Sequence, residues 1–175
     1  PRLLSSAASD VYKRQGHPYF YFTWGAAISE ALLDINTGES RILRADIVQD
    51  CGNSLNENID IGQIEGGFIQ GLGWLTCEEL CFSKEGKLLT TGPSTYKLPG
   101  SRDIPQTFNV KLLEKADNEE KTIFRSKAVG EPPLLLAISH FLALKEAIRA
   151  SSTNSRPELL NSPATPSEIL KVLKV

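Results

Sequence analysis

Ser126-Lys-Ala-Val-Gly-Glu-Pro-Pro133 leads directly into a mostly apolar stretch, residues 134–150, and this junction dominates the sequence. Proline fits the first turn of a helix, because the N–H group that it lacks would have no intrahelical partner there. We therefore predict a helix that starts at Pro132 or Pro133 and ends at Ala150. Two polar residues, Ser139 and His140, interrupt its apolar first part. We expect this helix to be buried for most of its length.

Glu131 lies where the predicted helix begins. Free N–H groups and the positive end of the helix dipole favour an ionised carboxylate at this point, whereas burial raises the pKa of a carboxyl group. Opposed effects of this kind tune general bases, so Glu131 is a candidate catalytic residue. A glutamate at a helix start is more often a capping or dipole residue. The residues alone leave both interpretations open.

A second motif, Gly62-Gln-Ile-Glu-Gly-Gly-Phe-Ile-Gln-Gly-Leu-Gly73, lies in a helix that we predict over 62–80, after the capping segment 58–60. Its five glycines each cost a helix about 1 kcal/mol relative to alanine, so another group must approach this backbone closely. Packing against a second helix explains most of them. A bulky cofactor at the helix start is the functional alternative, because the amide of Gln63 both donates and accepts hydrogen bonds.

The remaining elements follow from local signals. Dense aromatic residues predict a strand over 19–25, and strands over 26–35 and 40–48 form a hairpin around the turn 36–39. A second hairpin is predicted over 82–89, a loop over 91–105, and strands over 108–113 and 121–125. Thr165 and Pro166 resemble a helix start before a terminal helix over 169–173. Strands and helices mix without regular βαβ alternation, which indicates the α+β class.

The composition excludes several classes of function. A formal net charge of −2 argues against a nucleic-acid binder, which carries a basic surface. The apolar span at 61–75 is interrupted by polar residues and is too short to cross a membrane. Three cysteines are too few and too unevenly placed for a disulfide framework, which favours a reducing cytoplasmic setting. Two distant histidines and no clustered carboxylates predict no metal site built from protein ligands.

Three motifs in order resemble the xanthine dehydrogenase family: residues 62–73, Pro93-Ser-Thr-Tyr-Lys97 and residues 126–134. The resemblance runs from about Gly16 to Val175 and concerns the C-terminal part of the molybdenum-binding subunit. Residues 1–15 fall outside it, resemble a translated sequencing adapter, and are excluded from the fold prediction. Residues 16–175 are then expected to be a C-terminal fragment of a molybdenum cofactor-binding domain, and residues 1–15 are expected not to pack on it.

The resemblance implies a chemistry that the residues alone do not. Family members hydroxylate an electron-poor carbon beside a ring nitrogen, which oxidises hypoxanthine and xanthine to urate with water as oxygen donor and NAD as final acceptor. It implies molybdenum bound to molybdopterin, with 2Fe–2S clusters and FAD elsewhere in the complete enzyme. Glu131 would be the general base, and Gln63 and Gly130 would contact the cofactor. The implied partners are a purine substrate, the upstream part of the molybdenum subunit, the iron–sulfur/FAD subunit or domain, and further copies in an oligomer.

Two alternatives remain open at this stage. An aldehyde oxidase-like member of the same superfamily would use the same base on another substrate, although residues 93–97 and 129–133 favour xanthine dehydrogenase. Residues 73–80 favour a bacterial branch of that family. The other alternative is a packing fragment that is catalytically inactive in isolation.

Overall fold

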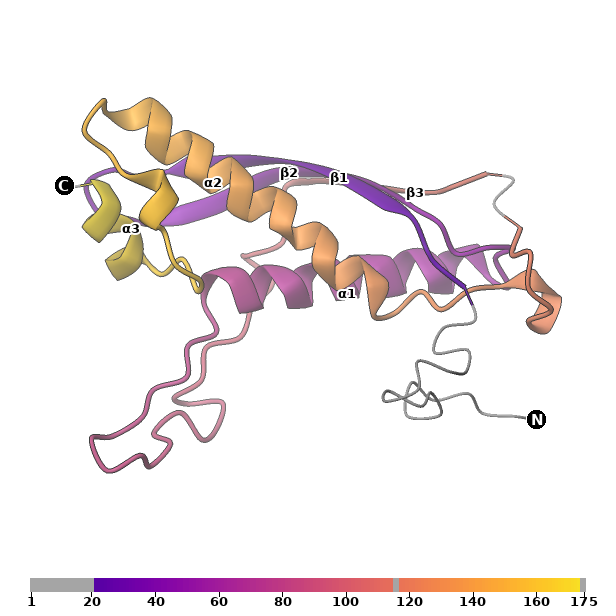
Figure 1. The fold of residues 1–175 in the computed structure, drawn as a ribbon, viewed down its shortest axis with the longest axis horizontal. Coiled ribbons are helices and arrows are strands. Elements are labelled where there is room, and N and C mark those ends of the chain that lie inside the picture. The colour runs from indigo at the N-terminus through magenta and orange to yellow at the C-terminus, as the bar shows by residue number, and fades with distance from the viewer. Residues whose placement is uncertain (1–20, 115–116, 174–175) are drawn as a thin grey trace, which may run out of the picture.

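The computed structural model describes residues 21–114 and 117–173, whose sheet and helices form two layers (Figure 1). The strands β1 (Gly25–Leu33), β2 (Ser40–Gln49) and β3 (Thr107–Leu112) form a sheet in the order β1-β2-β3. β1 is antiparallel to β2, whereas β3 is parallel to it. The predicted hairpin between the first two strands is confirmed, with Gly38 at a φ of +76° in its turn. The predicted α+β class is also confirmed.

The helices α1 (Glu57–Thr76) and α2 (Ile138–Ser151) cover one face of this sheet (Figure 1). On β2, Ile42, Ala45 and Ile47 are buried against the apolar stripe of α1, which consists of Ile64, Phe68, Leu72 and Leu75. That stripe recurs every three or four residues, so it lies on one side of the helix. α2 packs on β1, where the hydroxyl groups of Ser29 and Ser139 lie 2.7 Å apart.

A second core joins α2 to the C-terminal elements η4 (Pro157–Leu159) and α3 (Pro166–Leu173). It consists of buried residues from α2, α3 and the segment between them: Leu144, Ile148, Leu160, Ala164, Ile169 and Val172. The predicted start of the last helix is confirmed, because the Thr165 hydroxyl accepts a hydrogen bond from the Glu168 N–H at 3.4 Å and Pro166 is the first helical residue. Both cores lie on the same side of the sheet as α1 and α2.

Two of the predicted strands are wrong within the described residues. β1 begins at Gly25, which pairs with the last residue of β2, so residues 21–24 precede the sheet. The rest of the predicted 19–25 strand lies outside the described residues. Residues 123–125 form the 3-10 turn η2 (Ile123–Arg125), in which Phe124 and Arg125 have φ of 49° and 60°. A left-handed backbone is incompatible with a strand.

The predicted 132–150 helix exists, but its burial was predicted wrongly. Its first part is the 3-10 helix η3 (Pro132–Ala137), which α2 continues. Within α2 only His140, Leu144 and Ile148 are buried, and the side chains of Leu135 and Leu142 are 62% and 55% exposed. The physical reason is that one side of this helix packs on the sheet while no described segment covers the other.

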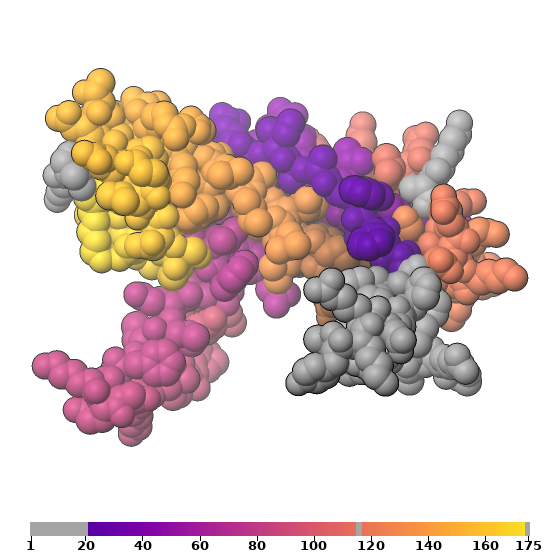
Figure 2. Space-filling view, viewed as in Figure 1, coloured from indigo at the N-terminus to yellow at the C-terminus, as the bar shows by residue number. Residues whose placement is uncertain are grey.

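α1 begins five residues earlier than predicted and ends four residues earlier. Asn56 caps it, since its side-chain oxygen accepts a hydrogen bond from the Ile59 N–H at 3.2 Å. The segment 77–106 then projects away from the two layers (Figures 1 and 2). Its predicted hairpin is reduced to one antiparallel bridge between Phe82 and Leu88, and the predicted loop over 91–105 is confirmed.

Some expectations concern residues beyond the described ranges. The prediction that residues 1–15 do not pack on the rest of the chain lies outside the described residues and stays a prediction. Among the described residues, no helix is long and apolar enough to cross a membrane.

Candidate active site

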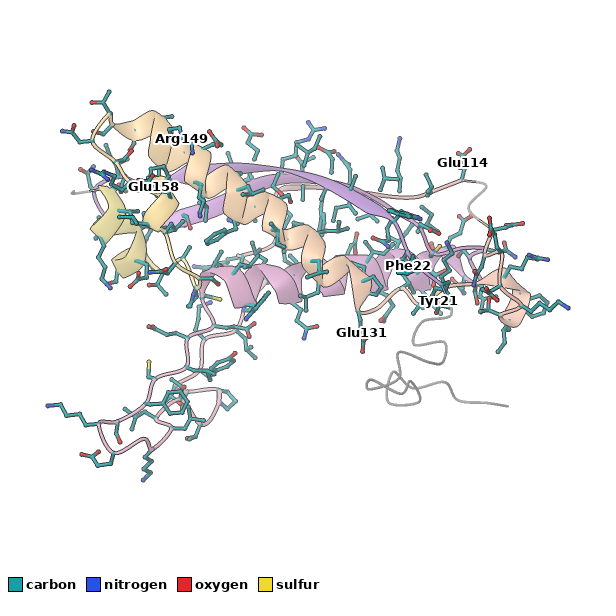
Figure 3. All side chains as sticks on the ribbon, viewed as in Figure 1. Tyr21, Phe22, Glu114, Glu131, Arg149 and Glu158 are labelled. Atoms are coloured by element: carbon teal, nitrogen blue, oxygen red, sulfur yellow. The ribbon has the colours of Figure 1, made fainter. Side chains whose placement is uncertain are left out.

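Glu131 immediately precedes η3, where Pro132 and Pro133 occupy the first two helical positions. Its side chain makes no capping hydrogen bond and is exposed, pointing away from the sheet (Figure 3). The expectation of a carboxylate in a buried helix mouth is therefore wrong for this chain. Because two prolines lack N–H groups and the Leu134 N–H donates to the Glu131 carbonyl oxygen at 3.1 Å, few free backbone donors remain there.

Gly130 brings this segment against α1, and the three predicted site residues meet there. A Cβ atom at Gly130 would lie 3.0 Å from Oε1 of Gln63, and one at Gly67 would lie 2.7 Å from the Gly130 carbonyl oxygen. A side chain at Gly67 would collide with this backbone oxygen and force α1 and residues 130–134 apart, whereas one at Gly130 would displace the end of the Gln63 side chain. The predicted close approach to the glycine-rich helix is thus confirmed, and it places Gln63 beside the peptide that carries Glu131.

A buried ion pair fixes the start of the same segment. Nζ of Lys127 lies 2.6 Å from Oδ2 of Asp50, the residue that follows β2. The Lys127 N–H also donates to the Cys51 carbonyl oxygen at 2.8 Å, and the Gly52 N–H donates to Oδ1 of Asp50 at 2.8 Å. The residue four positions before Glu131 is therefore tied to the end of the central strand by its backbone and its side chain.

Two further contacts hold residues 126–128 in place. Gly52 and Ser126 form an antiparallel bridge, and the Ala128 N–H donates to the Tyr21 hydroxyl at 2.9 Å. Burial raises the pKa of the neighbouring Cys51 thiol, and the charges of Asp60 and Asp50 raise it further. This thiol is consequently a neutral packing group.

The sequence analysis missed Asp50, Lys127 and Tyr21 as supports of the site. The available signal was one acidic residue two positions after a predicted strand and one lysine inside the 126–133 motif. Only the fold brings positions 77 residues apart in the chain into contact.

The outward side of α1 near Gln63 is open. Added Cβ atoms at Gly62 and Gly66 would meet no atom within 4 Å, in contrast to those at Gly67 and Gly71. Gln63 and Gly66 are three positions apart, so they are neighbours on the helix surface. These two glycines are therefore not explained by packing inside the described chain, and they leave bare backbone beside an exposed amide.

The third motif, residues 93–97, lies elsewhere. It belongs to the segment after the end of α1, and 14 residues of helix at 1.5 Å each separate Gln63 from Cys77, about 20 Å. Its side chains have structural roles: Oγ1 of Thr95 accepts from the Thr91 N–H at 3.1 Å, and the Tyr96 hydroxyl donates to Oε2 of Glu78 at 2.7 Å. The hydrogen bond to Glu78 raises the pKa of Tyr96.

Comparison with protein families identifies the fold. Residues 4–105 match the model of the molybdopterin cofactor-binding domain, which is more than half of the chain. The chain belongs to this family. Its cofactor is molybdopterin with molybdenum, as the motifs implied, and iron–sulfur clusters and FAD are typical of the complete enzymes.

The molybdopterin-binding domain described here is similar to part of much longer proteins. It is 53% identical over 160 residues to xanthine dehydrogenase/oxidase of Felis catus. The aligned region covers 88% of this chain and 12% of that protein. The corresponding protein of Gallus gallus is 52% identical over 158 residues, covering 89% and 12%. The predicted resemblance to xanthine dehydrogenase is confirmed, and the chain spans about 12% of the length of these curated relatives. The preference for a bacterial branch stays a prediction.

Solved structures share the fold. The crystal structure of quinoline 2-oxidoreductase from Pseudomonas putida 86 superposes with a TM-score of 0.70 at 26% identity, covering 81% of this chain and 17% of that one. Most of the fold of this chain is therefore shared with part of that oxidoreductase.

The residues of the described chain fit one wall of a molybdopterin site. Gly62 and Gly66 leave backbone that a flat bulky group can approach, and Gln63 presents donors and an acceptor at the same place. No group of three or more metal-ligating side chains exists among residues 21–114 and 117–173. In a domain of this kind the cofactor carries the metal, and the protein supplies binding and orientation.

Proposed function

We propose that this chain forms one wall of the cofactor site in a molybdenum hydroxylase of the xanthine dehydrogenase type, with Glu131 as the general base. The observation that supports this most is that Gly130 packs on α1 at Gly67, with Oε1 of Gln63 beside it, and that Glu131 follows Gly130 directly. These residues come from two distant motifs, and the fold holds both against one another through Gly67 and the Lys127–Asp50 ion pair.

Each of the three residues has a distinct part. Molybdopterin supplies the redox chemistry when it is bound. Gln63 holds the pterin by donating and accepting hydrogen bonds, and Gly130 keeps the approach free because it has no side chain. The carboxylate of Glu131 accepts a proton from the water that provides the oxygen atom, which is general-base catalysis. The anchored loop fixes the backbone that carries Glu131 beside Gln63.

The proposed substrates are hypoxanthine and xanthine, which the complete enzyme oxidises to urate. Electrons leave through 2Fe–2S clusters and FAD to NAD, on the iron–sulfur/FAD subunit or domain, and the upstream part of the molybdenum subunit completes the pocket in an oligomer. Identity of 53% to a protein named for xanthine supports the purine over an aldehyde. Three free cysteines support a reducing cytoplasmic location.

The test is the Glu131→Gln variant of a complete enzyme that contains this chain. Glutamine keeps the shape and removes the basic group, so xanthine turnover is expected to fall about 10²- to 10⁴-fold with full molybdenum content. Glu120→Gln is the matched control, since Glu120 is equally exposed and lies outside the site. A Glu131→Gln enzyme that keeps its molybdenum and turns over within a few-fold of the parent would remove Glu131 from the mechanism.

The chain on its own is proposed to be inactive. It offers one open wall, whereas ligand sites bury most of a ligand between several elements. Purified chain that retained stoichiometric molybdenum and oxidised xanthine would contradict this part of the proposal.

A further inference from the structure

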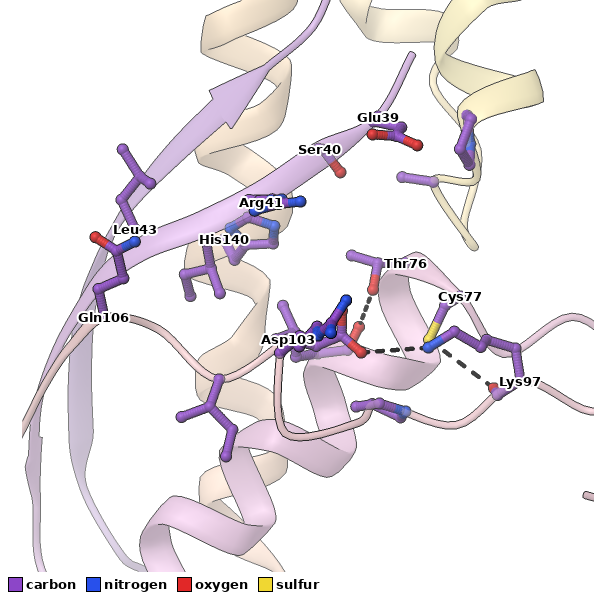
Figure 4. Close-up of a pocket in the computed structure, with 17 residues that line it drawn as sticks. Glu39, Ser40, Arg41, Leu43, Thr76, Cys77, Lys97, Asp103, Gln106 and His140 are labelled. Atoms are coloured by element: carbon purple, nitrogen blue, oxygen red, sulfur yellow. Dashed lines mark hydrogen bonds and ion pairs between the residues drawn. The ribbon is translucent and has the colours of Figure 1, made fainter. Parts of the chain in front are cut away.

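A cavity of about 360 Å³ lies at the opposite end of α1 from Gln63 (Figure 4). Its walls come from the start of β2, the last turn of α1, the segment 97–106, α2 and the residues before α3. This volume is within the range of small-molecule sites in proteins. None of the proposed active-site residues lines it, so it is a separate feature of the fold.

Two arginine side chains, those of Arg41 on β2 and Arg102 in the segment 97–106, line this cavity. Within the described residues, neither side chain has an ion pair or a hydrogen bond, although the charge of Arg41 acts on Asp103 and helps to lower its pKa. The other cation, Lys97, pairs with Asp103 at 3.2 Å, and Glu39 contributes the one remaining carboxylate. Three cations, Arg41, Lys97 and Arg102, line the cavity with two carboxylates, Glu39 and Asp103. The cavity therefore has an excess of positive charge carried by guanidinium groups.

His140 is the buried polar group of the cavity wall. Its side chain is 2% exposed, and Nδ1 has no hydrogen-bond partner among the described residues. Burial lowers the pKa of His140 to about 4, so the imidazole is neutral at neutral pH and one ring nitrogen is an acceptor. Nδ1 is itself enclosed by protein atoms, so the imidazole reaches a molecule in the cavity only through the rest of its ring.

We propose that this cavity binds a small organic anion, whose carboxylate or phosphate group is held by Arg41 and Arg102 and whose N–H or O–H group donates to His140. Guanidinium groups bind such oxygen pairs in a fork-like geometry. The carbon skeleton lies against the apolar part of the wall, which consists of Ile42, Leu72, Ile104 and Ala164. In Figure 4 Ser40 and Arg41 lie across this space from Thr76 and Asp103. The proposal is independent of the chemistry at Glu131.

Citrate and inorganic phosphate are the probes, because citrate carries both carboxylates and a hydroxyl group. The chain is titrated with each by calorimetry at constant ionic strength, with chloride as the reference anion. Saturable binding of citrate is expected. Arg41→Gln and Arg102→Gln are each expected to weaken it about 10- to 100-fold, the effect of losing a charged hydrogen bond. His140→Leu, which keeps an apolar side chain of similar size, is expected to weaken citrate binding as well.

Arg44→Gln is the matched control. Arg44 lies on the same strand and loses the same charge, but it pairs with Asp46 outside the cavity, so citrate binding is expected to be unchanged. Circular dichroism of each variant confirms that it is folded before its affinity is compared. The proposal is overturned if neither citrate nor phosphate binds saturably. It is equally overturned if the Arg41 and Arg102 variants lose no more affinity than the Arg44 variant.

Discussion

Nζ of Lys127 lies 2.6 Å from Oδ2 of Asp50, and the two side chains are only 10% and 1% exposed. Removal of one partner from such a pair leaves a buried charge without compensation, which typically costs about 3–5 kcal/mol. We expect Lys127→Met to lower the free energy of unfolding by that amount in urea denaturation.

Lys121→Met is the control for this experiment, because Lys121 is exposed and its loss should change stability by less than about 0.5 kcal/mol. The double variant Asp50→Leu/Lys127→Met should recover part of the loss, since no buried charge remains. A Lys127→Met loss as small as that of Lys121→Met would show that water solvates Asp50.

The glycines of α1 separate into two classes that mutation can distinguish. A Cβ atom at Gly71 would overlap the Leu134 carbonyl oxygen and lie 2.9 Å from the Cβ atom of Ala137. Gly71→Ala is therefore expected to destabilise the chain by about 1–3 kcal/mol, as overpacking does. Gly66→Ala meets no atom of the described chain and should stabilise it by up to about 1 kcal/mol, the helix preference of alanine. Thermal unfolding of both variants measures the difference, and equal effects would contradict it.

The open side of α1 makes a separate prediction for the complete enzyme. Gly66→Leu fills the space that we assign to the pterin, so the ratio of molybdenum to protein should fall while the fold is kept. Gly92→Leu is the control, because Gly92 also has no neighbour within 4 Å in the described chain but lies in the segment 77–106. Unchanged molybdenum content in the Gly66 variant would place the cofactor elsewhere.

His140 predicts a pH dependence of stability. Its pKa is lowered from 6.5 to about 4 in the folded chain, so between these values the unfolded chain binds a proton that the folded chain does not. Stability is therefore complete above pH 6.5 and falls as the pH drops towards 4. The full shift corresponds to about 3 kcal/mol.

His140→Leu should remove this part of the pH dependence in denaturation curves measured between about pH 7 and 4. Carboxyl groups with lowered pKa values, such as those of Asp103 and Glu168, begin to lose their contribution only as the pH falls to about 4.5 and below, and this loss is shared by both proteins. Parallel pH curves for the parent and the variant would show that His140 is not desolvated.

Local patterns predicted the elements that depend on local interactions. The hairpin of β1 and β2, the glycine-rich helix and the helix start at Pro166 follow from turn residues, periodicity and capping, which act within a few positions of the chain. The family resemblance implied that Gln63 and Gly130 contact the same cofactor, and therefore that they lie near one another. The close approach of another segment to α1 was predicted because its glycines lower the stability of a helix. The support by Asp50 and Lys127 was not predictable, because nothing near either residue specifies its partner.

The errors have a common physical cause, the influence of tertiary partners. Residues 21–24 have strand-forming aromatics, but β2 ends at Gln49, the partner of Gly25, so they lie past the end of the ladder. Residues 121–125 are β-prone, yet Oγ1 of Thr122 donates to the Ser126 carbonyl oxygen at 2.7 Å and closes a local turn instead. The exposed side of α2 was predicted to be buried because composition reports how apolar a helix is, and not what covers it.

The parallel pairing of β2 with β3 has a consequence for how the chain folds. The strands are separated by all of α1 and the segment 77–106, and Ser29 bonds to Ser139 from 110 positions away. Such distant pairings raise the contact order, and chains with high contact order fold in milliseconds to seconds rather than microseconds. Because the loop-closure entropy must be overcome before these contacts form, the two halves of the Gln63–Gly130 junction come together late. During synthesis, a nascent chain that ends before residue 126 therefore exposes Gly67 and Gly71 of α1. They stay exposed until residues 130–137, which pack on them, have left the ribosome.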